Sequence, residues 1–311
     1  MTGRLCEDRV VVITGAGRGV GRGYALEFAR RGAKVIVNDL GAGGDGQGET
    51  SLDPAQQVVQ EIIDAGGEAI ADGHDVADFD GAREMINLAV DRYGRLDVLV
   101  NNAGILRDRT IVNMGIEEWD SVIRVHLRGT FAPTHWAATH WRERAKAGEP
   151  VDGRLINTTS SSGLYSNPGQ ANYAAAKAGI ASLTIVASRE LERYGVTANA
   201  VYPTALSRLT EDVFRKAGRL KEHAENGFYD LDPENVAPLV AWLGSKESHD
   251  VNGRIFGVRG GKIVVASGWR AGPTIESGSR WDAASLGDVV RPLIAQAPAN
   301  AGTNGLVPNP A

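Results

Sequence analysis

Cysteine is nearly absent from this sequence. One cysteine, Cys6, occurs in 311 residues, which excludes an internal disulfide and fits a reducing compartment. An excess of positive charge is also missing: 33 Lys and Arg stand against 38 Asp and Glu, so we expect no nucleic-acid partner. No apolar run approaches the roughly 18 residues of a membrane span, and the first residues carry no signal-peptide pattern. We therefore expect a soluble, cytoplasmic protein that does not bind membranes.

A linker rich in Pro or Ser is missing as well. The length alone would suit two domains, but α/β folds of this size often form one. The hydrophobic content of 42% is ample for a core. From Gly268 onward Gly, Pro, Ser, Ala and Asn predominate. We predict a single domain at 1–267 and a C-terminal extension at 268–311 that is partly disordered, above all at 297–311.

What the sequence does contain is a glycine-rich turn between an apolar strand and a helix. Residues 10–13 predict a buried strand, 20–30 have helical periodicity, and a second apolar strand ends at Asp39, which is a βαβ pattern. Pyrophosphate must approach the unpaired N–H groups of a helix N-terminus, and a Cβ at the closest points would hold the phosphates away. We therefore predict that a dinucleotide lies over this turn, which contains Gly15, Gly17, Gly19 and Gly21.

The acidic residue at the end of the second strand predicts the cofactor type. Asp39 lies about 20 residues after the glycines, where a carboxylate can accept hydrogen bonds from the adenosine ribose and repel a 2′-phosphate. We expect NAD(H), while Arg18 in the turn keeps NADP(H) as the lesser alternative. A second stretch, 41–46, matches the generic G-x-G-x-x-G pattern, but it follows the second strand and has no helical segment directly behind it. We expect no phosphate site there; its loop is either a flexible connection or lies beside the adenosine.

The remaining apolar patterns alternate between short strands and amphipathic helices. Strands are predicted at 68–72, 96–100, 154–157, 197–201, 255–258 and 263–265. Helices are predicted at 53–64 (with Asp53 as N-cap and Pro54 at the first helical position), 79–93, 117–144, 171–194 and 232–243. The buried stripe of the long helix is expected to contain Val122, Val125, His126 and Phe131. This alternation predicts an α/β fold with a parallel sheet.

Two strand ends carry further candidate cofactor contacts. Asp75 and Val76 follow the third strand, where they could bind adenine; Asp75 could also cap the next helix, and both roles can hold together. Small residues follow the fourth strand, where a cofactor would cross the sheet edge. The full set of expected cofactor contacts is Gly15, Arg18, Gly19, Val20, Gly21, Asp39, Leu40, Asp75, Val76, Asn102, Ala103, Gly104, Tyr173, Lys177, Pro203 and Leu206. We expect no metal site.

The candidate catalytic residues are a tyrosine, a lysine and a serine. Tyr173 and Lys177 are four residues apart in a predicted helix, so they share one face. A tyrosine can exchange a proton with an alcohol near neutral pH only if its pKa, ordinarily about 10, is lowered, and we expect the Lys177 ammonium to lower it. We choose Ser160 from the hydroxyl cluster 158–162 as the hydrogen-bond donor to the substrate oxygen; the cluster could instead only cap a turn.

Together these motifs resemble the short-chain dehydrogenase/reductase family over roughly residues 7–265. More narrowly, VNDLG, NNAGILRDR, RVHLRGTF and GQANYAAAK, with residues 205–210, resemble the (3R)-hydroxyacyl-CoA dehydrogenase portion of peroxisomal multifunctional enzyme type 2. The resemblance implies a Rossmann-type, doubly wound sheet of about seven strands and a homodimer or homotetramer built on long helices. It also implies catalytic roles for Ser160, Tyr173 and Lys177.

The sequence departs from the common family pattern at two positions. His126 replaces an asparagine that holds a proton-relaying water, as it does in the narrower subset, so it is either a buried structural residue or a relay. Thr204 replaces the glycine after Pro203, which leaves Leu206, Ser207 and the Thr204 hydroxyl as candidate contacts to the nicotinamide amide. The charged, amphipathic stretch 204–229 is the predicted substrate lid.

These observations support one leading function and two alternatives. The leading hypothesis is NAD-dependent oxidation of a secondary alcohol, or its reverse, on an acyl-CoA or sterol-like substrate. Reduction of 3-oxoacyl groups on acyl carrier protein is the nearest alternative, which Asp39 and the acidic charge balance disfavour. A non-catalytic, dinucleotide-binding sensor is the alternative from another class, and the complete set Ser160, Tyr173 and Lys177 disfavours it.

Overall fold

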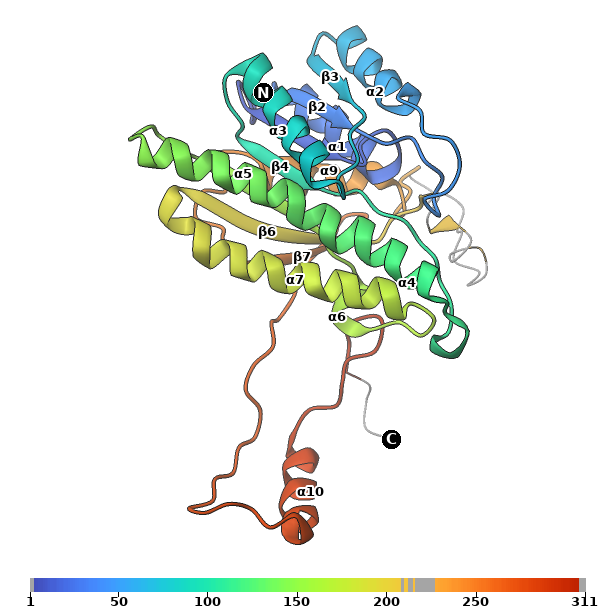
Figure 1. Ribbon diagram of the computed structural model, residues 1–311, viewed down its shortest axis with the longest axis vertical. Coiled ribbons are helices and arrows are strands. Elements are labelled where there is room, and N and C mark those ends of the chain that lie inside the picture. Colours follow the sequence, from blue (N-terminus) through green and yellow to red (C-terminus); the bar gives the residue numbers. More distant parts are fainter. Residues whose placement is uncertain (1–2, 208–209, 212–214, 216–226, 308–311) are drawn as a thin grey trace.

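The computed structural model describes residues 3–207, 210–211, 215 and 227–307. The predicted α/β fold with a parallel sheet is confirmed (Figure 1). One sheet of eight strands has the order β3-β2-β1-β4-β5-β6-β7-β8, and only the edge strand β8 is antiparallel to its neighbour. The strands are β1 (Val10–Thr14), β2 (Lys34–Asn38), β3 (Glu68–Asp72), β4 (Val98–Asn101), β5 (Gly153–Thr158), β6 (Val196–Pro203), β7 (Ile255–Arg259) and β8 (Lys262–Val265).

The centre of the sheet explains why its strands are continuous apolar runs. All residues of β1 and β4 are buried, because helices cover both faces of a parallel sheet. β1 pairs with β2 on one side and with β4 on the other. The strand order therefore reverses between β1 and β4, and the crevice outside the carboxyl ends of these two strands is where a doubly wound fold binds its ligand.

Two layers of helices enclose two hydrophobic cores. Helices α1 (Gly19–Arg30), α2 (Asp53–Asp64) and α9 (Ala237–Leu243) contribute Phe28, Ile62 and Leu243 to the core on one face. Helices α3 (Phe79–Tyr93), α5 (Gly129–Lys146) and α7 (Ala171–Leu191) contribute Met85, Trp141 and Leu191 to the other. Figure 1 shows α5 and α7 as long neighbouring helices on the same side of the sheet.

The predicted long helix 117–144 is not continuous. It consists of α4 (Ile116–Ile123), a π-helical turn (Arg124–Arg128) and α5. Pro133 lacks the N–H that would bond to Gly129 four residues earlier, next to the point where the helical pitch changes. Its predicted stripe is also only partly right: Val122 and His126 are buried and Val125 is half-buried, but Phe131 is 46% exposed.

Other helix ends differ from the predictions by small steps. Helix α2 begins at Asp53 itself, with Leu52 in the N-cap position and no side-chain cap, so Asp53 as N-cap was wrong. The helix predicted at 171–194 leaves α-helical geometry at Leu191 and ends in a 3₁₀ turn, Glu192–Tyr194. The helix predicted at 232–243 opens with the 3₁₀ turn Pro233–Val236, where the Asp232 side chain accepts from the Glu234 N–H.

The C-terminal extension leaves the sheet domain after β8. Figure 1 shows it as a long arm carrying a 3₁₀ turn (Ala283–Ser285) and α10 (Leu286–Gln296) before its end returns toward α6 (Ser161–Tyr165). Most of the predicted lid at 204–229, and 308–311 of the predicted disordered end, lie outside the described residues. Among the helices that the structure describes, none has the length and apolar character needed to cross a membrane.

Candidate active site

A groove lies at the carboxyl ends of β1 and β4, where the strand order predicts a ligand site. Its lining brings together the glycine-rich turn, the end of β2, the segment after β3, the loop after β4 and the start of α7. Of the expected cofactor contacts, Leu206 and the further candidate Thr204 are absent from the lining. The predicted contacts in the groove are Gly15, Arg18, Gly19, Val20, Gly21, Asp39, Leu40, Asp75, Val76, Asn102, Ala103, Gly104, Tyr173, Lys177 and Pro203.

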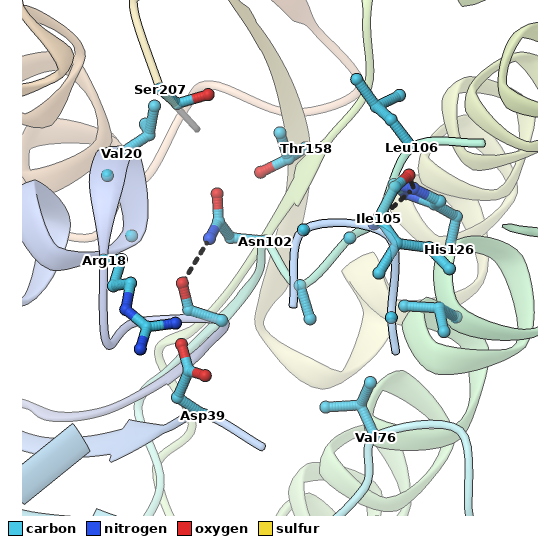
Figure 2. A pocket seen from close by; sticks show the side chains of 18 of the residues that line it. Arg18, Val20, Asp39, Val76, Asn102, Ile105, Leu106, His126, Thr158 and Ser207 are labelled. Atoms are coloured by element: carbon cyan, nitrogen blue, oxygen red, sulfur yellow. Dashed lines mark hydrogen bonds between the residues drawn. The ribbon is translucent and has the colours of Figure 1, made fainter. Parts of the chain in front are cut away.

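The glycine turn is fixed against the loop after β4. Asn102 Nδ2 donates to the carbonyl oxygens of Thr14 and Gly15 at 3.1 and 3.0 Å, and Figure 2 shows this amide facing the turn. A Cβ on Gly15, whose φ is +61°, would lie 2.7 Å from Ala103 Cα, and one on Gly21 would lie 2.2 Å from the Gly15 oxygen. These two glycines are therefore required by packing within the protein itself, in addition to any approach of a phosphate.

The Asp39 carboxylate is held by two backbone amides at the end of β2. Its Oδ2 accepts from Gly17 N at 2.8 Å and its Oδ1 from Gly41 N at 2.7 Å. Each oxygen keeps a further lone pair for a ligand hydroxyl. Figure 2 shows the Arg18 guanidinium on the same side of the groove as this carboxylate.

The segment after β3 shows that Asp75 is not the N-cap of the next helix. Asp78, not Asp75, caps α3: its Oδ2 accepts from Gly81 N at 3.1 Å. The Asp75 carboxylate accepts from Ala77 N at 2.8 Å and from Arg124 Nη2 at 2.5 Å, so the π-helical turn holds it in place. Val76 lines the groove beside it (Figure 2).

The structure shows where the glycine loop, residues 41–51, lies, which the sequence alone left open. It reaches across to the loop after β4, where Leu106 N donates to Gly44 O at 3.1 Å and Arg107 Nε donates to Asp45 O at 2.8 Å. Gly43, Gly44 and Gly46 line the groove. Sequence reasoning did not single out these contacts, because backbone carbonyls make them and only the glycine richness was visible.

The three candidate catalytic residues lie close together, and two of them, Tyr173 and Lys177, line the groove. Ser160 lies close enough to the Tyr173 phenol to lower its pKa, and the Ser160 Oγ accepts from Ser162 N at 3.1 Å, so Ser160 also caps α6. The Lys177 Nζ lies 5.6 Å from the centroid of the Tyr173 ring and donates to Thr158 O at 2.6 Å. Ser160 can therefore cap a turn and still serve as the candidate hydrogen-bond donor to the substrate oxygen.

Close packing of α6 on α7 makes this meeting feasible. A Cβ on Gly163 would lie 2.6 Å from the backbone carbon of Lys177, so only glycine fits there. Thr159 Oγ1 donates to the Lys177 carbonyl at 2.7 Å, which joins the end of β5 to the same turn of α7. The positions of Ser160 and Lys177 are therefore coupled through backbone contacts.

Burial sets the protonation of the tyrosine and the lysine. It raises the pKa of Tyr173 to about 12, against an opposing effect of the Ser160 hydrogen bond. It lowers the pKa of Lys177 to about 7, because an ammonium loses hydration in this interior. The expected lowering of the tyrosine pKa is therefore not seen in the chain alone, because burial disfavours the charged phenolate.

His126 packs against the same tyrosine. The two rings are perpendicular with centroids 5.1 Å apart. His126 Nε2 lies 3.1 Å from Ile105 N and 2.7 Å from Ile105 O (Figure 2). Burial and the nearby Lys177 lower the pKa of His126 to about 3, so the imidazole is neutral at ordinary pH. Its Nδ1 is buried without a hydrogen-bond partner among the described residues.

The segment after β6 contributes some of the expected residues to the groove, including Ser207, but not Leu206 or Thr204. Leu206 N donates to Leu231 O at 2.7 Å, and Leu206 does not line the groove. Ala205 and Ser207 line it instead, and Figure 2 shows Ser207 facing the turn that carries Val20. The role of Leu206 as a cofactor contact therefore stays a prediction that the groove lining does not support. In the described residues, no group of three His, Cys, Asp or Glu side chains could hold a metal.

Comparison with known proteins identifies this arrangement. The model of the short chain dehydrogenase family matches residues 9–216, which include the glycine turn and the Tyr173–Lys177 helix. The chain belongs to the short-chain dehydrogenase family. It is therefore related to oxidoreductases that act on CH–OH groups.

Individual members show how far the similarity extends. Hydroxyacyl-CoA dehydrogenase ChsB1 of Mycobacterium tuberculosis is 44% identical over 92% of this chain and 89% of its own length. Peroxisomal multifunctional enzyme type 2 of Mus musculus is 44% identical over 83% of this chain, but the match spans only 32% of that protein. A 3-oxoacyl-[acyl-carrier-protein] reductase of Synechocystis is 39% identical over 82% of this chain and 97% of its own length.

A solved structure is similar to this chain over nearly its whole length. The crystal structure of a short chain dehydrogenase from Mycobacterium avium matches with a TM-score of 0.84 and 51% identity. The match covers 96% of this chain and 98% of that one, so it includes much of the C-terminal extension.

Proposed function

We propose that this dehydrogenase transfers a hydride between NAD(H) and a secondary alcohol or ketone, with a 3-hydroxyacyl-CoA or a hydroxysteroid-type molecule as substrate. The observation that carries the proposal is that Tyr173 and Lys177 line a groove built on the glycine turn, with Ser160 next to the Tyr173 phenol. A phenol that can exchange a proton with an alcohol oxygen is what this reaction needs beside a nicotinamide.

The groove suits a dinucleotide. The turn presents N–H groups at the start of α1, and Gly19 adopts a φ of +54°, which favours glycine at this position. We assign the pyrophosphate to this turn, the ribose hydroxyls of the adenosine to Asp39, and the adenine to Asp75 and Val76. Asp39 is held by Gly17 and Gly41 as a hydrogen-bond acceptor, which favours NAD(H) over a cofactor with a 2′-phosphate.

The proton chemistry belongs to the protein side chains. When bound, NAD⁺ supplies the hydride acceptor and a positive charge near the phenol. Tyr173 takes the alcohol proton in the oxidation and returns it in the reduction, while Ser160 hydrogen-bonds the substrate oxygen. Lys177 stabilises the ionised phenol and also reaches the nicotinamide ribose. We assign His126 a positioning role, because a neutral imidazole stacked edge-on against Tyr173 fixes the ring.

The substrate class rests on the relatives and on charge. Two of the related proteins carry dehydrogenase or multifunctional-enzyme names that fit acyl-CoA oxidation, while a third is a reductase of acyl carrier protein substrates. Acyl carrier protein is acidic and favours a basic partner, whereas this chain has a net charge of −5. We therefore place the thioester of coenzyme A ahead of acyl carrier protein.

The deciding experiment is turnover on a panel of substrates with NAD⁺ and, separately, NADP⁺. The panel contains 3-hydroxyacyl-CoA of several lengths, hydroxysteroids and a 3-oxoacyl-[acyl-carrier-protein] in the reducing direction. We expect NAD⁺-linked activity on the thioesters. Activity on steroids alone would support the proposed mechanism but identify a steroid, not a thioester, as the substrate. NADPH-linked activity on the carrier protein substrate alone would favour the reductase alternative.

Tyr173→Phe separates an enzyme from a dinucleotide-binding sensor. The variant keeps the ring that packs on His126 but lacks the exchangeable proton, so turnover should fall at least about 1,000-fold while NAD binding changes little. Turnover and calorimetric titration with NAD⁺ measure the two effects on one sample. Turnover equal to the wild type would contradict the assignment of Tyr173 as the acid and base.

A further inference from the structure

A buried polar cluster links the loop after β4 to the start of α7, just outside the groove. At its centre Gln170 is only 7% exposed. Its Oε1 accepts from Ser162 Oγ at 2.7 Å and from Asn167 Nδ2 at 2.9 Å, and its Nε2 donates to Asp108 Oδ2 at 2.8 Å. The cluster therefore connects α6, which follows Ser160, with the loop that contains Asp108.

A second buried amide strengthens the same connection. Asn172 Nδ2 donates to the carbonyl oxygens of Arg107 and Glu118, both at 3.0 Å. Asn172 Oδ1 accepts from the backbone N–H of Tyr173 at 2.7 Å. The turn that carries the Tyr173 phenol is thus tied to both sides of Asp108 along the chain.

Asp108 is unusual because its carboxylate has no cationic partner among the described residues. Its Oδ1 is buried without a hydrogen-bond partner in that part of the chain. The neighbouring arginines are directed elsewhere: Arg107 Nε donates to Asp45 O, and Arg109 Nη1 donates to the backbone carbonyl of Asp108. Burial accordingly raises the pKa of Asp108. A half-buried carboxylate without a cation costs stability, so a purely structural role would be served better by an amide.

The groups that act on the phenol come from four places. Lys177 lies one turn further along α7, His126 packs on the ring from the π-helical turn, and Ser160 lies at the end of β5. Asp108, in the loop after β4, is bonded to Gln170, three residues before Tyr173. His126 is neutral at ordinary pH. Asp108 is the anionic group that acts on Tyr173, and its charge raises the pKa of the phenol.

We propose that Asp108 is a positioning residue of the reaction: its bridge to Gln170 fixes the turn that carries Tyr173, and its negative charge opposes ionisation of the phenol. Asp108 thereby favours the protonated tyrosine that the reducing direction needs, and it sets the pH at which oxidation becomes fast. The inference rests on the proposed role of Tyr173 as acid and base.

Asp108→Asn tests the charge without removing the bridge, since an asparagine Oδ1 can still accept from Gln170 Nε2. The measurement is the pH profile of kcat in the oxidising direction, with NAD⁺ and the thioester that the panel identifies. We expect the rising limb to move to lower pH by about one unit, so kcat below the limb rises about tenfold. Asp108→Glu, which keeps the charge, should leave the limb where it is in the wild type, even with a lower kcat.

Two further variants make the outcome decisive. Asp120→Asn removes the same charge from an exposed position of α4 and should leave the profile unchanged. Asp108→Ser also removes the charge, by replacing the carboxylate with a smaller neutral side chain, and it must move the limb in the same direction. This variant serves as the test if the Asn variant does not fold. An unmoved limb, or one moved to higher pH, in folded Asn or Ser variants would overturn the inference while leaving the proposed function intact. If the Tyr173→Phe variant turned over as fast as the wild type, both the proposed role of Tyr173 and the inference about Asp108 would be overturned.

Discussion

Lys177 is buried where its charge is unfavourable, with 3% of its surface exposed. Burial lowers its pKa from 10.5 to about 7, so the unfolded chain binds this proton more tightly than the folded chain does between those values. The free energy of unfolding should therefore rise with pH across this window. We predict that Lys177→Met is more stable than the wild type at pH 7, by about 2 kcal/mol, while turnover is lost.

Urea unfolding at pH 7 and pH 9.5 checks this prediction. The advantage of Lys177→Met should shrink at the higher pH, because the wild-type lysine is then closer to neutral in both states. Lys246→Met, at an exposed position, serves as the control for the loss of a charge. A Lys177→Met variant that is less stable than the wild type at pH 7 would contradict the argument.

In a lower pH range than the one set by Lys177, His126 should make the folded protein sensitive to acid. Its pKa is lowered from 6.5 to about 3, so the unfolded chain takes up a proton that the folded interior refuses. The wild type should lose stability progressively as the pH falls from about 6.5 toward 3. His126→Asn lacks this group and should show a smaller fall in urea midpoint between pH 7 and pH 4.5, even if it is less stable at pH 7. His249→Asn, at an exposed position, is the control, and equal falls in both variants would refute the prediction.

At the level of elements, the sequence predicted best where one local signal decides the structure. β3 at 68–72 and α3 at 79–93 have the predicted bounds, because turn residues and apolar periodicity enclose both. The groove residues followed from the rule that parallel strands end at one edge of the sheet. The positions of the groove residues depend on the sheet topology, and the alternation of strands and helices in the sequence predicts that topology.

The predictions failed or lack support where contacts distant in sequence decide. The π-helical turn before α5 brings His126 to the backbone of Ile105, and no periodicity encodes that contact. Leu206 turns toward Leu231 rather than into the groove, since a backbone bond fixes it there. The glycine loop lies across the groove through its carbonyl oxygens, for which side-chain patterns give no signal.

The glycine loop leads to a prediction about cofactor release. Arg107 Nε and Leu106 N hold its carbonyls over the groove, so the loop must detach before a dinucleotide can leave by that side. Arg107→Gln removes one of the two links and should weaken NAD⁺ binding about three- to tenfold, mainly through faster dissociation. Stopped-flow fluorescence of NADH release measures the rate. The exposed Arg128→Gln is the control, and an unchanged release rate for Arg107→Gln would show that the loop does not limit exit.

At the scale of the whole molecule, the core and the extension are separate in their packing. Both hydrophobic cores are complete by Val258: no buried core residue follows it in the described chain. The extension instead exposes large apolar side chains, with Trp269 97% exposed, and α10 contains no buried residue. One close approach of the extension to the domain is at Tyr165, where a Cβ on Gly305, with φ +78°, would lie 2.9 Å from the ring.

Removing the extension should therefore leave the folded domain nearly unchanged. A chain that stops after Ser267 keeps β8, whose pairing with β7 covers the edge of the sheet, and loses no core residue. We predict a free energy of unfolding within about 1 kcal/mol of the full chain, measured by urea denaturation. A chain that stops after Gly261 also loses β8 and should be less stable by at least about 2 kcal/mol, because Phe256 and Val258 lose their paired strand. A large loss already at Ser267 would mean that the extension stabilises the domain through contacts beyond Tyr165.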